Sequence, residues 1–475
     1  MRRCLIVLFS SILFLFYFLP IVIAVYFIVP AKFNKARNII LLIASLFFYS
    51  WGEPVYVFLM IYSSVFNYVM AQQIEKEVSH GRKGNADLIF TVVVNLFILG
   101  FFKYYGFLME TINGILGTNI HYTKLALPIG ISFYTFQALS YIFDVHKKTV
   151  PAQHRFLNFA LYLSLFPQLI AGPIVKYRDI SEQLERRSTS IDKFGQGTVR
   201  FIFGLGKKVL LANNFGALYE EITAYGSGSQ ATVLTFWIGA LAYTLQIYFD
   251  FSGYSDMAIG LGKIFGFDFL ENFNYPYISR SITDFWRRWH ISLSSWFRDY
   301  VYIPLGGSFV DKKRRHIFNL MVVWALTGLW HGAAWNFVFW GMYYGIILII
   351  EKYLLENILQ KLPGPVLHIY TLLIVMVGWI FFSSPGLGAA LHYLSVMFGF
   401  GAHGFADMTT LYHLRTSGIL LLFGCIVSTP YPIEYFRKFI TRHAIIAMLL
   451  VFGILLLSTA NLVYNAYNPF LYFRF

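Results

Sequence analysis

Long apolar runs alternate with short polar or basic loops along almost the whole 475-residue chain. A helix needs about 20 residues to cross a ~30 Å hydrocarbon core. Apolar segments that predict helices cover residues 5–29, 39–51, 55–70, 87–102, 128–144, 156–171, 199–212, 231–249, 317–330, 334–350, 366–382, 386–400, 416–428 and 444–464. Segments 39–51, 199–212 and 416–428 are too short to span, so we expect them to be re-entrant, tilted or packed inside a bundle. The pattern predicts an all-α polytopic membrane protein, and no internal repeat is visible.

Composition supports the membrane assignment. Only 13% of the residues are charged, about half the share in a soluble domain. The formal net charge of +14 would suggest nucleic acid in a soluble protein. Here we expect the basic residues to lie in cytoplasmic loops facing anionic lipid, with no nucleic-acid partner. The two cysteines, Cys4 and Cys425, form no CxxC motif, and we expect neither redox chemistry nor a bound metal or cofactor.

Loop charges predict part of the topology. The apolar run after Met1 continues to Val29 without a small-residue cleavage site, so we interpret it as a first span and not as a secretory signal. The basic residues of loop 30–37 place that loop in the cytoplasm. A full span at 156–171 would then put the basic residues of 176–187 outside. Because Pro167 and Pro173 break this segment, we expect a re-entrant loop that keeps them inside.

The mostly apolar segment between residues 243 and 279 contains two carboxylates of interest. Asp250 and Asp256 are too far apart in sequence to share a helical face, and no third carboxylate is near. An acid–base pair is one interpretation. The other is that they cap helices and satisfy neighbouring backbone in a buried turn.

The stretch after Ser281 predicts one amphipathic helix, with Ser281 at its start. One stripe carries Trp286, Trp289, Leu293, Trp296 and Tyr300, and the adjacent stripe carries Arg287, His290, Ser294 and Arg298. Its charged residues, at roughly 2.5–3.5 kcal/mol each, would cost on the order of 15 kcal/mol at the midplane of the bilayer. We therefore expect this helix at the interface or beside a wet cavity, with tryptophans at headgroup level and arginines available to an anionic ligand.

A second stretch places a histidine at membrane depth. The basic cluster Lys312–Arg315 is predicted to be cytoplasmic, and the apolar run from Ile317 to Trp330 would extend roughly 21 Å as a helix. His331 would then stop inside the membrane, where a titratable group is a functional-site hypothesis. The flanking Gly328 and Gly332 allow backbone or substrate to approach. The alternative is a core histidine bonded to a neighbouring carbonyl. For His290 both a functional and a structural role stay open.

Four motifs of the chain are distinctive: Phe251-Ser-Gly-Tyr-Ser-Asp-Met-Ala-Ile-Gly-Leu-Gly262, Asn272-Phe-Asn-Tyr-Pro-Tyr277, Asp284-Phe-Trp-Arg-Arg-Trp-His-Ile-Ser-Leu-Ser-Ser-Trp296 and Gly328-Leu-Trp-His-Gly332. Together they resemble the membrane-bound O-acyltransferase family, in the branch of the alginate O-acetylation membrane protein. The likeness extends from Phe9 to the closing Asn468-Pro-Phe-Leu-Tyr-Phe-Arg-Phe475. The long Trp-Arg-Arg-Trp-His motif is highly specific, and the family's invariant histidine matches His331, with its second polar position at His290.

The resemblance implies one domain over residues 1–475, with transmembrane, re-entrant and interfacial helices around a funnel or tunnel and a catalytic core at about 240–345. It implies a multi-pass enzyme of the bacterial cytoplasmic membrane. Such an enzyme takes an acyl group, usually acetyl, from acetyl-CoA or an acyl carrier and moves it toward an exported glycan. An extracytoplasmic esterase-like partner and a polysaccharide export complex are expected with it. Because the family also acts on peptidoglycan and transfers D-alanine to teichoic acid, the acceptor stays open: alginate, another exopolysaccharide, cellulose, peptidoglycan or teichoic acid.

Acyl transfer from a thioester needs a base for the hydroxyl and a donor for the oxyanion. A neutral His331 at depth suits the base, because burial lowers the pKa of histidine. No GxSxG elbow supports a serine intermediate, so we favour direct transfer, with an acyl-histidine as the alternative. As residues that bind donor or substrate we select Arg287, Trp289, Arg298, Trp330 and Asn336. The rival classes are a proton-relaying transporter or flippase and a scaffold for an export complex.

Overall fold

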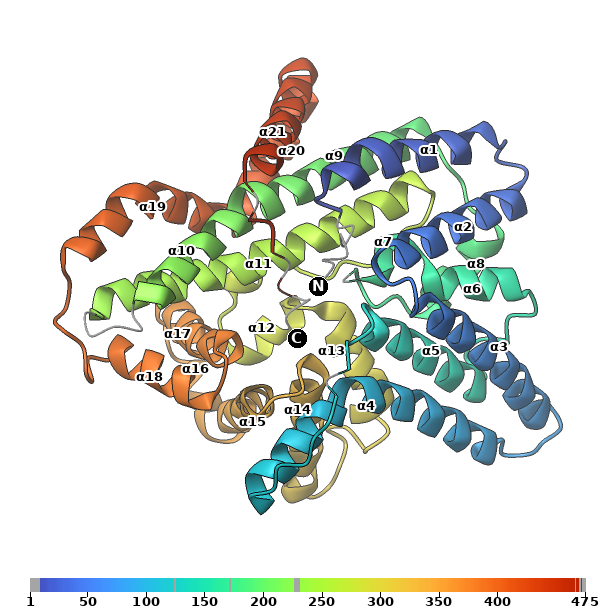
Figure 1. Ribbon diagram of the computed structural model, residues 1–475, viewed down its shortest axis with the longest axis horizontal. Coiled ribbons are helices and arrows are strands. Elements are labelled where there is room, and N and C mark those ends of the chain that lie inside the picture. The colour runs from blue at the N-terminus through green and yellow to red at the C-terminus, as the bar shows by residue number, and fades with distance from the viewer. Residues whose placement is uncertain are drawn as a thin grey trace. The chain divides into compact units, whose positions relative to one another are not determined.

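A computed structural model of the chain describes residues 9–123, 125–170, 172–225, 231–465, 467–469 and 471 (Figure 1). Residues 1–8 and, in the closing motif, residues 470 and 472–475 lie outside the described residues. Every regular element among the described residues is helical, which confirms the all-α prediction. The chain divides into two compact units, residues 1–201 with 254–270, and residues 202–253 with 271–475. The single domain over 1–475 stays a prediction.

The first unit contains the N-terminal helices. They are the π-helical turn Phe14–Phe18 that continues into α1 (Leu19–Ile28), α2 (Asn34–Gly52), α3 (Val57–Ser79), α4 (Asn85–Leu116), α5 (Ile131–His146), α6 (Phe156–Ser164), α7 (Phe166–Leu169), α8 (Tyr177–Glu185) and most of α9 (Ile191–Gly206). Its core joins Tyr49 of α2, Met60 of α3, Leu99 of α4 and Tyr134 of α5. The unit is thus held by apolar packing between helices that are neighbours in sequence.

The second unit contains the predicted catalytic stretch. Its helices are the π-helical segment Lys207–Ala212, α10 (Asn213–Tyr225), most of α11 (Val233–Ile264), α12 (Ile282–Arg288), α13 (Ile291–Phe297), α14 (Lys313–His331), α15 (Trp335–Ile350), α16 (Glu356–Leu359), α17 (Gly364–Ser383), α18 (Leu387–Met397), α19 (Met408–Val427), α20 (Tyr431–Arg442) and α21 (Ala444–Tyr464). Within it α14 and α15 lie side by side (Figure 1).

Six helices among the described residues are long and apolar enough to cross a membrane. They are Val57–Ser79, Asn85–Leu116, Trp335–Leu359, Gly364–Ser383, Met408–Val427 and Ala444–Tyr464. The multi-pass prediction is confirmed. Within the first unit, α3 and α4 are joined by a reciprocal pair of amide hydrogen bonds between Asn67 and Asn95, at 2.9 and 3.1 Å. Such polar pairs join spanning helices where hydrocarbon offers no alternative partner.

Two of the topology predictions can be compared with the helices. The start predicted for segment 416–428, and hence its short length, is wrong, because α19 begins eight residues earlier at Met408. Asp407 caps this helix by accepting from the Thr410 backbone N–H. The re-entrant interpretation of 156–171 stays a prediction. It agrees with the length of α6, which has only nine residues, about 14 Å of helix, and with the pocket that Arg155 before α6 and Arg186 after it both line.

Candidate active site

The helix predicted over residues 282–300 is interrupted at its most informative point. α12 starts as expected, because the Ser281 hydroxyl accepts from the Asp284 backbone N–H at 3.0 Å. The helix ends before Trp289, and α13 begins after His290. His290 has a left-handed backbone with φ +44°. The prediction of one continuous helix is therefore wrong. The tryptophan stripe is buried inside the protein, whereas we expected these tryptophans at headgroup level.

Asn272 is the physical reason for this interruption. Its backbone oxygen accepts from the Ile291 N–H at 2.9 Å, and its Oδ1 accepts from the Ser292 N–H at 3.2 Å and from the Ser292 hydroxyl at 2.8 Å. The first N–H groups of α13 therefore bond to a distant segment instead of to the preceding helix. The same Oδ1 lies 3.1 Å from Nδ1 of His290. Because this oxygen is an acceptor, Nδ1 carries the hydrogen, and Nε2 of the neutral ring has the lone pair.

His290 lies in the interior of the second unit, where only 1% of its surface is exposed. Its ring is 4.7 Å from the Phe251 ring and 6.0 Å from the Trp330 ring. Burial lowers the pKa of His290 to about 3, so the imidazole is neutral at pH 7. The expectation of an interfacial histidine is wrong: the break in the helix turns this side chain inward.

His331 is positioned by close contact between α14 and α15. A Cβ at Gly328 would collide with the Phe337 carbonyl oxygen, and a Cβ at Gly341 would collide with the Trp324 carbonyl oxygen. Only glycine lets the two backbones approach this closely. His331 is the last residue of α14 and is 7% exposed. Gly328, near His331, therefore makes room for the backbone of α15. The sequence had left open whether backbone or substrate would approach this glycine.

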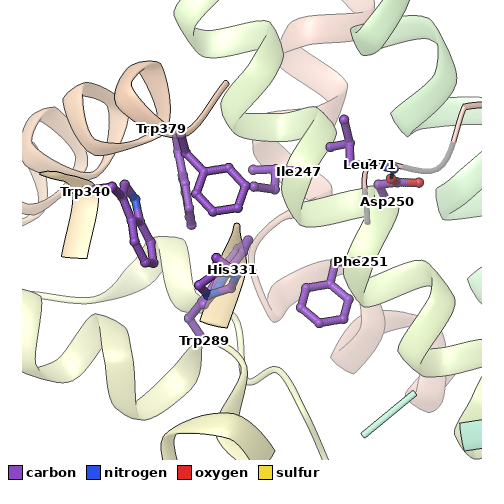
Figure 2. A pocket seen from close by; sticks show the side chains of 9 residues that line it. Ile247, Asp250, Phe251, Trp289, His331, Trp340, Trp379 and Leu471 are labelled. Atoms are coloured by element: carbon purple, nitrogen blue, oxygen red, sulfur yellow. Dashed lines mark hydrogen bonds between the residues drawn. The ribbon is translucent and has the colours of Figure 1, made fainter. Parts of the chain in front are cut away.

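His331 lines a small cavity of about 20 Å³ in the second unit (Figure 2). Its other lining residues are Ile247, Asp250, Phe251, Trp289, Trp340, Trp379, Phe382 and Leu471. The His331 ring lies 5.0 Å from the Trp340 ring and 5.3 Å from the Phe382 ring. This volume holds one or two water molecules. A polar, titratable group is thus surrounded by aromatic walls.

A buried ion pair holds one wall of the cavity in place. Asp250 Oδ1 lies 2.8 Å from Lys208 Nζ, and both side chains are almost fully buried. Asp250 Oδ2 accepts from the Leu471 N–H at 2.9 Å. Lys208 also donates to Asn213 Oδ1 at 2.8 Å and to the Pro469 carbonyl oxygen. The pair therefore fixes the closing segment of the chain, which brings Leu471 to the cavity.

The interpretation of Asp250 and Asp256 as residues of a buried turn is wrong, because both lie inside α11. Asp250 bonds to Lys208 in the second unit, and Asp256 bonds to Arg200 at 2.9 Å in the first. Each carboxylate has its own basic partner. An acid–base pair formed by these two residues finds no support in this bonding.

The selected residues separate into three groups. Trp289 and His331 line the cavity, and Trp330 contacts both histidine rings, at 6.0 Å from His290 and 5.0 Å from His331. Asn336 is buried away from the cavity lining and donates to the Ser384 carbonyl oxygen at 3.0 Å.

Arg287 and Arg298 are exposed and do not line the cavity, and Arg298 bonds to Asp299 at 3.0 Å. Sequence reasoning missed Trp340 and Lys208, since an indole or a lysine in an apolar run has no distinctive spacing. Among the described residues no group of three or more His, Cys, Asp or Glu side chains forms a metal-binding cluster.

Comparison with known proteins decides the family. Residues 144–386 match the family model described as the membrane-bound O-acyltransferase family. The chain belongs to this family. The matched region of this O-acyltransferase includes both histidines and all the cavity-lining residues except Leu471.

The acyltransferase is similar to several characterised or named relatives. It is 42% identical over 432 residues to the probable alginate O-acetylase AlgI of Azotobacter vinelandii, covering 90% of this chain and 85% of that one. It is 37% identical to AlgI of Pseudomonas putida, covering 98% and 100%. It is 35% identical to the peptidoglycan O-acetyltransferase of Helicobacter pylori, covering 84% and 81%.

Proposed function

We propose that this acyltransferase resides in the bacterial cytoplasmic membrane and moves an acetyl group from a cytoplasmic donor toward an exported polysaccharide such as alginate. The donor class is acetyl-CoA or an acetylated carrier. The observation that supports this chemistry is that the buried His331 lines a small cavity with aromatic walls. The polysaccharide class rests on the similarity to the AlgI relatives over most of both chains. Peptidoglycan is the second candidate acceptor, favoured by the similarity to the Helicobacter pylori enzyme.

In the proposed reaction His331 is the general base. The imidazole accepts the proton of an acceptor hydroxyl while that oxygen attacks the thioester carbonyl. The carbonyl becomes a tetrahedral oxyanion, and its collapse breaks the carbon–sulfur bond. The departing thiolate takes the proton from the imidazolium, so the base is regenerated. In the alternative route the imidazole nitrogen itself attacks the thioester carbonyl, and the carbon–sulfur bond breaks to release the thiolate. The acyl-histidine then transfers its acyl group to the acceptor hydroxyl, whose proton passes to the thiolate, and the neutral imidazole is regenerated.

Trp340 supplies the group most suited to the oxyanion. Its indole N–H is buried and has no hydrogen-bond acceptor among the described residues. Its ring lies 5.0 Å from the His331 ring and lines the same cavity. An indole nitrogen can only donate. A donor that is already desolvated and fixed costs no reorganisation when charge develops on the carbonyl oxygen.

His290 has a different role in this proposal. With a pKa of about 3 it is a poor base at pH 7, since a general base works best near the operating pH. Its Nε2 lone pair instead accepts a hydrogen bond, from substrate or from a neighbouring group, beside Trp330 and Phe251. His290 is therefore proposed to orient the reacting groups and not to remove their protons.

A cavity of about 20 Å³ cannot hold a thioester and an acceptor, so the reaction requires a wall to move. The exposed Arg287 and Arg298 are proposed to attract the anionic donor, together with the basic cluster Lys312–Arg315. An extracytoplasmic esterase-like partner and a polysaccharide export complex are proposed to receive the acetyl group.

The test compares His331→Ala with a matched control, His413→Ala. His413 is another buried histidine, 1% exposed, on α19 and outside the cavity lining. Both proteins are purified in detergent, and CoA release from acetyl-CoA and acetylation of an oligosaccharide acceptor are measured per folded molecule. We expect the activity of His331→Ala to fall by roughly 10²–10⁴-fold. His413→Ala should keep the activity of the wild type. Wild-type turnover by a folded His331→Ala protein would refute the assignment.

A further inference from the structure

A basic pocket of about 800 Å³ lies in the first unit, between the loop before α2 and the segment after α8. Its basic residues are Lys32, Lys35, Arg155, Arg186 and Arg187, and its single carboxylate is Glu185. None of these basic side chains forms an ion pair with a carboxylate of the described residues. The pocket therefore has an excess of positive charge that the described part of the protein does not neutralise.

The buried Arg37 lies close to Arg187 of this pocket and increases that charge. The guanidinium groups of Arg37 and Arg187 lie 4.7 and 5.8 Å from the centre of the Tyr26 ring. Arg37 bonds to the Val29 carbonyl oxygen and the Thr189 hydroxyl, both uncharged, at 2.9 and 3.0 Å. Burial lowers the pKa of Arg187, the Tyr26 hydroxyl opposes this shift, and the nearby charge of Arg37 adds to it. Like charges held this close are unfavourable unless an anion is near.

The start of α2 adds a third positive contribution. The helix has 19 residues, and no side chain caps its first N–H groups. Its first turns carry Lys35 and Arg37 and no acidic residue. Cations at the positive end of a helix dipole are destabilising, whereas an anion there is stabilised by the free N–H groups. The arrangement suits a bound phosphate.

An apolar groove of about 610 Å³ follows the same pair of helices. Its lining residues are Leu13, Tyr17, Phe18, Ile21, Val22, Val25, Ile40, Ile43, Ala44, Phe47, Phe48 and Trp51. From Ile40 to Trp51 it follows α2 for roughly 16 Å, about the depth of one leaflet of a bilayer. Lys35 lies just over one turn before Ile40, so the groove begins close to the basic pocket.

We propose that the α1–α2 hairpin binds one anionic phospholipid. The phosphate of the headgroup occupies the basic pocket, and an acyl chain occupies the apolar groove. A soluble phosphate compound would use only the pocket, and an apolar partner helix would use only the groove. Because the basic pocket and the apolar groove follow each other along one hairpin, the arrangement favours a molecule that has both a phosphate group and an acyl chain.

The experiment uses the full chain purified in detergent. Binding of phosphatidylglycerol and of phosphatidylcholine with identical acyl chains is measured by native mass spectrometry and by the shift in melting temperature. The pocket variant is Lys35→Gln with Arg186→Gln. Its control is Lys83→Gln with Lys361→Gln, which removes the same charge from exposed positions elsewhere. At about 1 kcal/mol for each basic residue near the lipid surface, the pocket variant should bind phosphatidylglycerol roughly 30-fold more weakly. The control pair should bind it as the wild type does.

A groove variant, Ala44→Trp, separates lipid from other occupants. It fills the groove without a change in charge, so it should weaken phosphatidylglycerol binding and leave any effect of sn-glycerol 3-phosphate or adenosine 3′,5′-bisphosphate unchanged. Equal loss in the control pair would show nonspecific attraction and overturn the proposal. Stabilisation of the wild type by the soluble phosphates to the same extent as by lipid, with Ala44→Trp unaffected, would show a soluble-phosphate site and also overturn it. Lys35 and Arg186 are exposed, so the pocket variant should fold even if Ala44→Trp does not, and the proposal can then be tested with the pocket variant alone.

Discussion

Replacing His290 with asparagine separates the functional from the structural role of this histidine. Asparagine tolerates the left-handed backbone that His290 adopts at φ +44°. Its amide N–H occupies the position of Nδ1, so it retains a donor for Asn272 Oδ1. What it loses is Nε2, the atom to which the proposed mechanism assigns a role. Alanine is less informative, because it also removes the bond to Asn272 and is poorly suited to the left-handed region.

The expected magnitudes differ enough to distinguish the two variants. Asparagine is smaller than histidine by roughly 40 Å³, which at about 24 cal/mol per Å³ costs about 1 kcal/mol of stability. Alanine leaves a larger cavity, loses a hydrogen bond worth about 1 kcal/mol and adds backbone strain of about 1 kcal/mol. We expect a loss of about 3 kcal/mol for His290→Ala. If Nε2 takes part in the reaction, both variants lose turnover by roughly 10²–10⁴.

The assay measures melting temperature and specific activity on the same detergent-purified sample. The matched control is Ser292→Ala, because the Ser292 hydroxyl bonds to the same Asn272 oxygen at 2.8 Å. This control should lose about 1 kcal/mol and retain its activity. If His290→Asn is as active per folded molecule as Ser292→Ala, then His290 only supports the helix break, and His331 alone remains in the site.

The low pKa of His290 also predicts a pH dependence of stability. The unfolded chain binds a proton at this residue below about pH 6.5, whereas the folded protein does so only near pH 3. Stability from this group is therefore present above pH 6.5 and is lost as pH falls toward 3. The loss approaches about 1.4 kcal/mol for each pH unit. His290→Asn should lose stability less steeply than the wild type between pH 6 and pH 4, and equal slopes would contradict the burial of this ring.

Three further predictions concern other parts of the chain. Lys208→Met should destabilise the protein by about 3–5 kcal/mol through the buried charge left on Asp250, and Asp250→Leu in addition should restore much of the melting temperature; no recovery would argue against the ion pair. Trp340→Phe should lower turnover by roughly 10²–10³ with little change in melting temperature, as for the loss of an oxyanion donor, and normal turnover would remove Trp340 from the mechanism. Lys313→Cys should not react with an impermeant thiol reagent in intact cells, since the basic cluster is predicted to be cytoplasmic. Labelling of this cysteine would show that the predicted topology is inverted.

The sequence predicted the membrane class well, and it singled out a histidine that the structure places at the lining of a buried cavity. Apolar runs long enough to cross a bilayer are a strong signal, and a titratable group inside one is rare enough to be noticed. Two short segments show the limits of this reasoning. The prolines at 167 and 173 indicated that the segment 156–171 is not one long helix, and α6 does end at Ser164. The polar first turns of α19, in contrast, hid a helix that begins at Met408 after its Asp407 cap.

The helix break at His290 could not be predicted from periodicity. The pattern from Trp286 to Tyr300 is consistent with a single helix, and the buried stripe agrees with that pattern. What overrides it is Asn272, which supplies the acceptors for the first N–H groups of α13 from a segment distant in sequence. The orientation of His290 depends on that tertiary contact. For the same reason Asp250 resembled a turn residue, because its partner Lys208 lies on another element.

The buried pair of Lys208 and Asp250 is better explained by geometry than by stability. Removing two charges from water costs several kcal/mol for each ion, and apolar residues of similar size often serve stability as well or better. What an apolar pair would not provide is the acceptor for the Leu471 N–H and the donor for the Pro469 carbonyl oxygen. Because Leu471 lines the cavity with His331, these two bonds hold one wall of that cavity in place. The cavity holds only one or two waters, so substrates enter only when a wall gives way. A wall held by a few polar bonds at the end of the chain is easier to displace than the tryptophans packed between α14, α15 and α17.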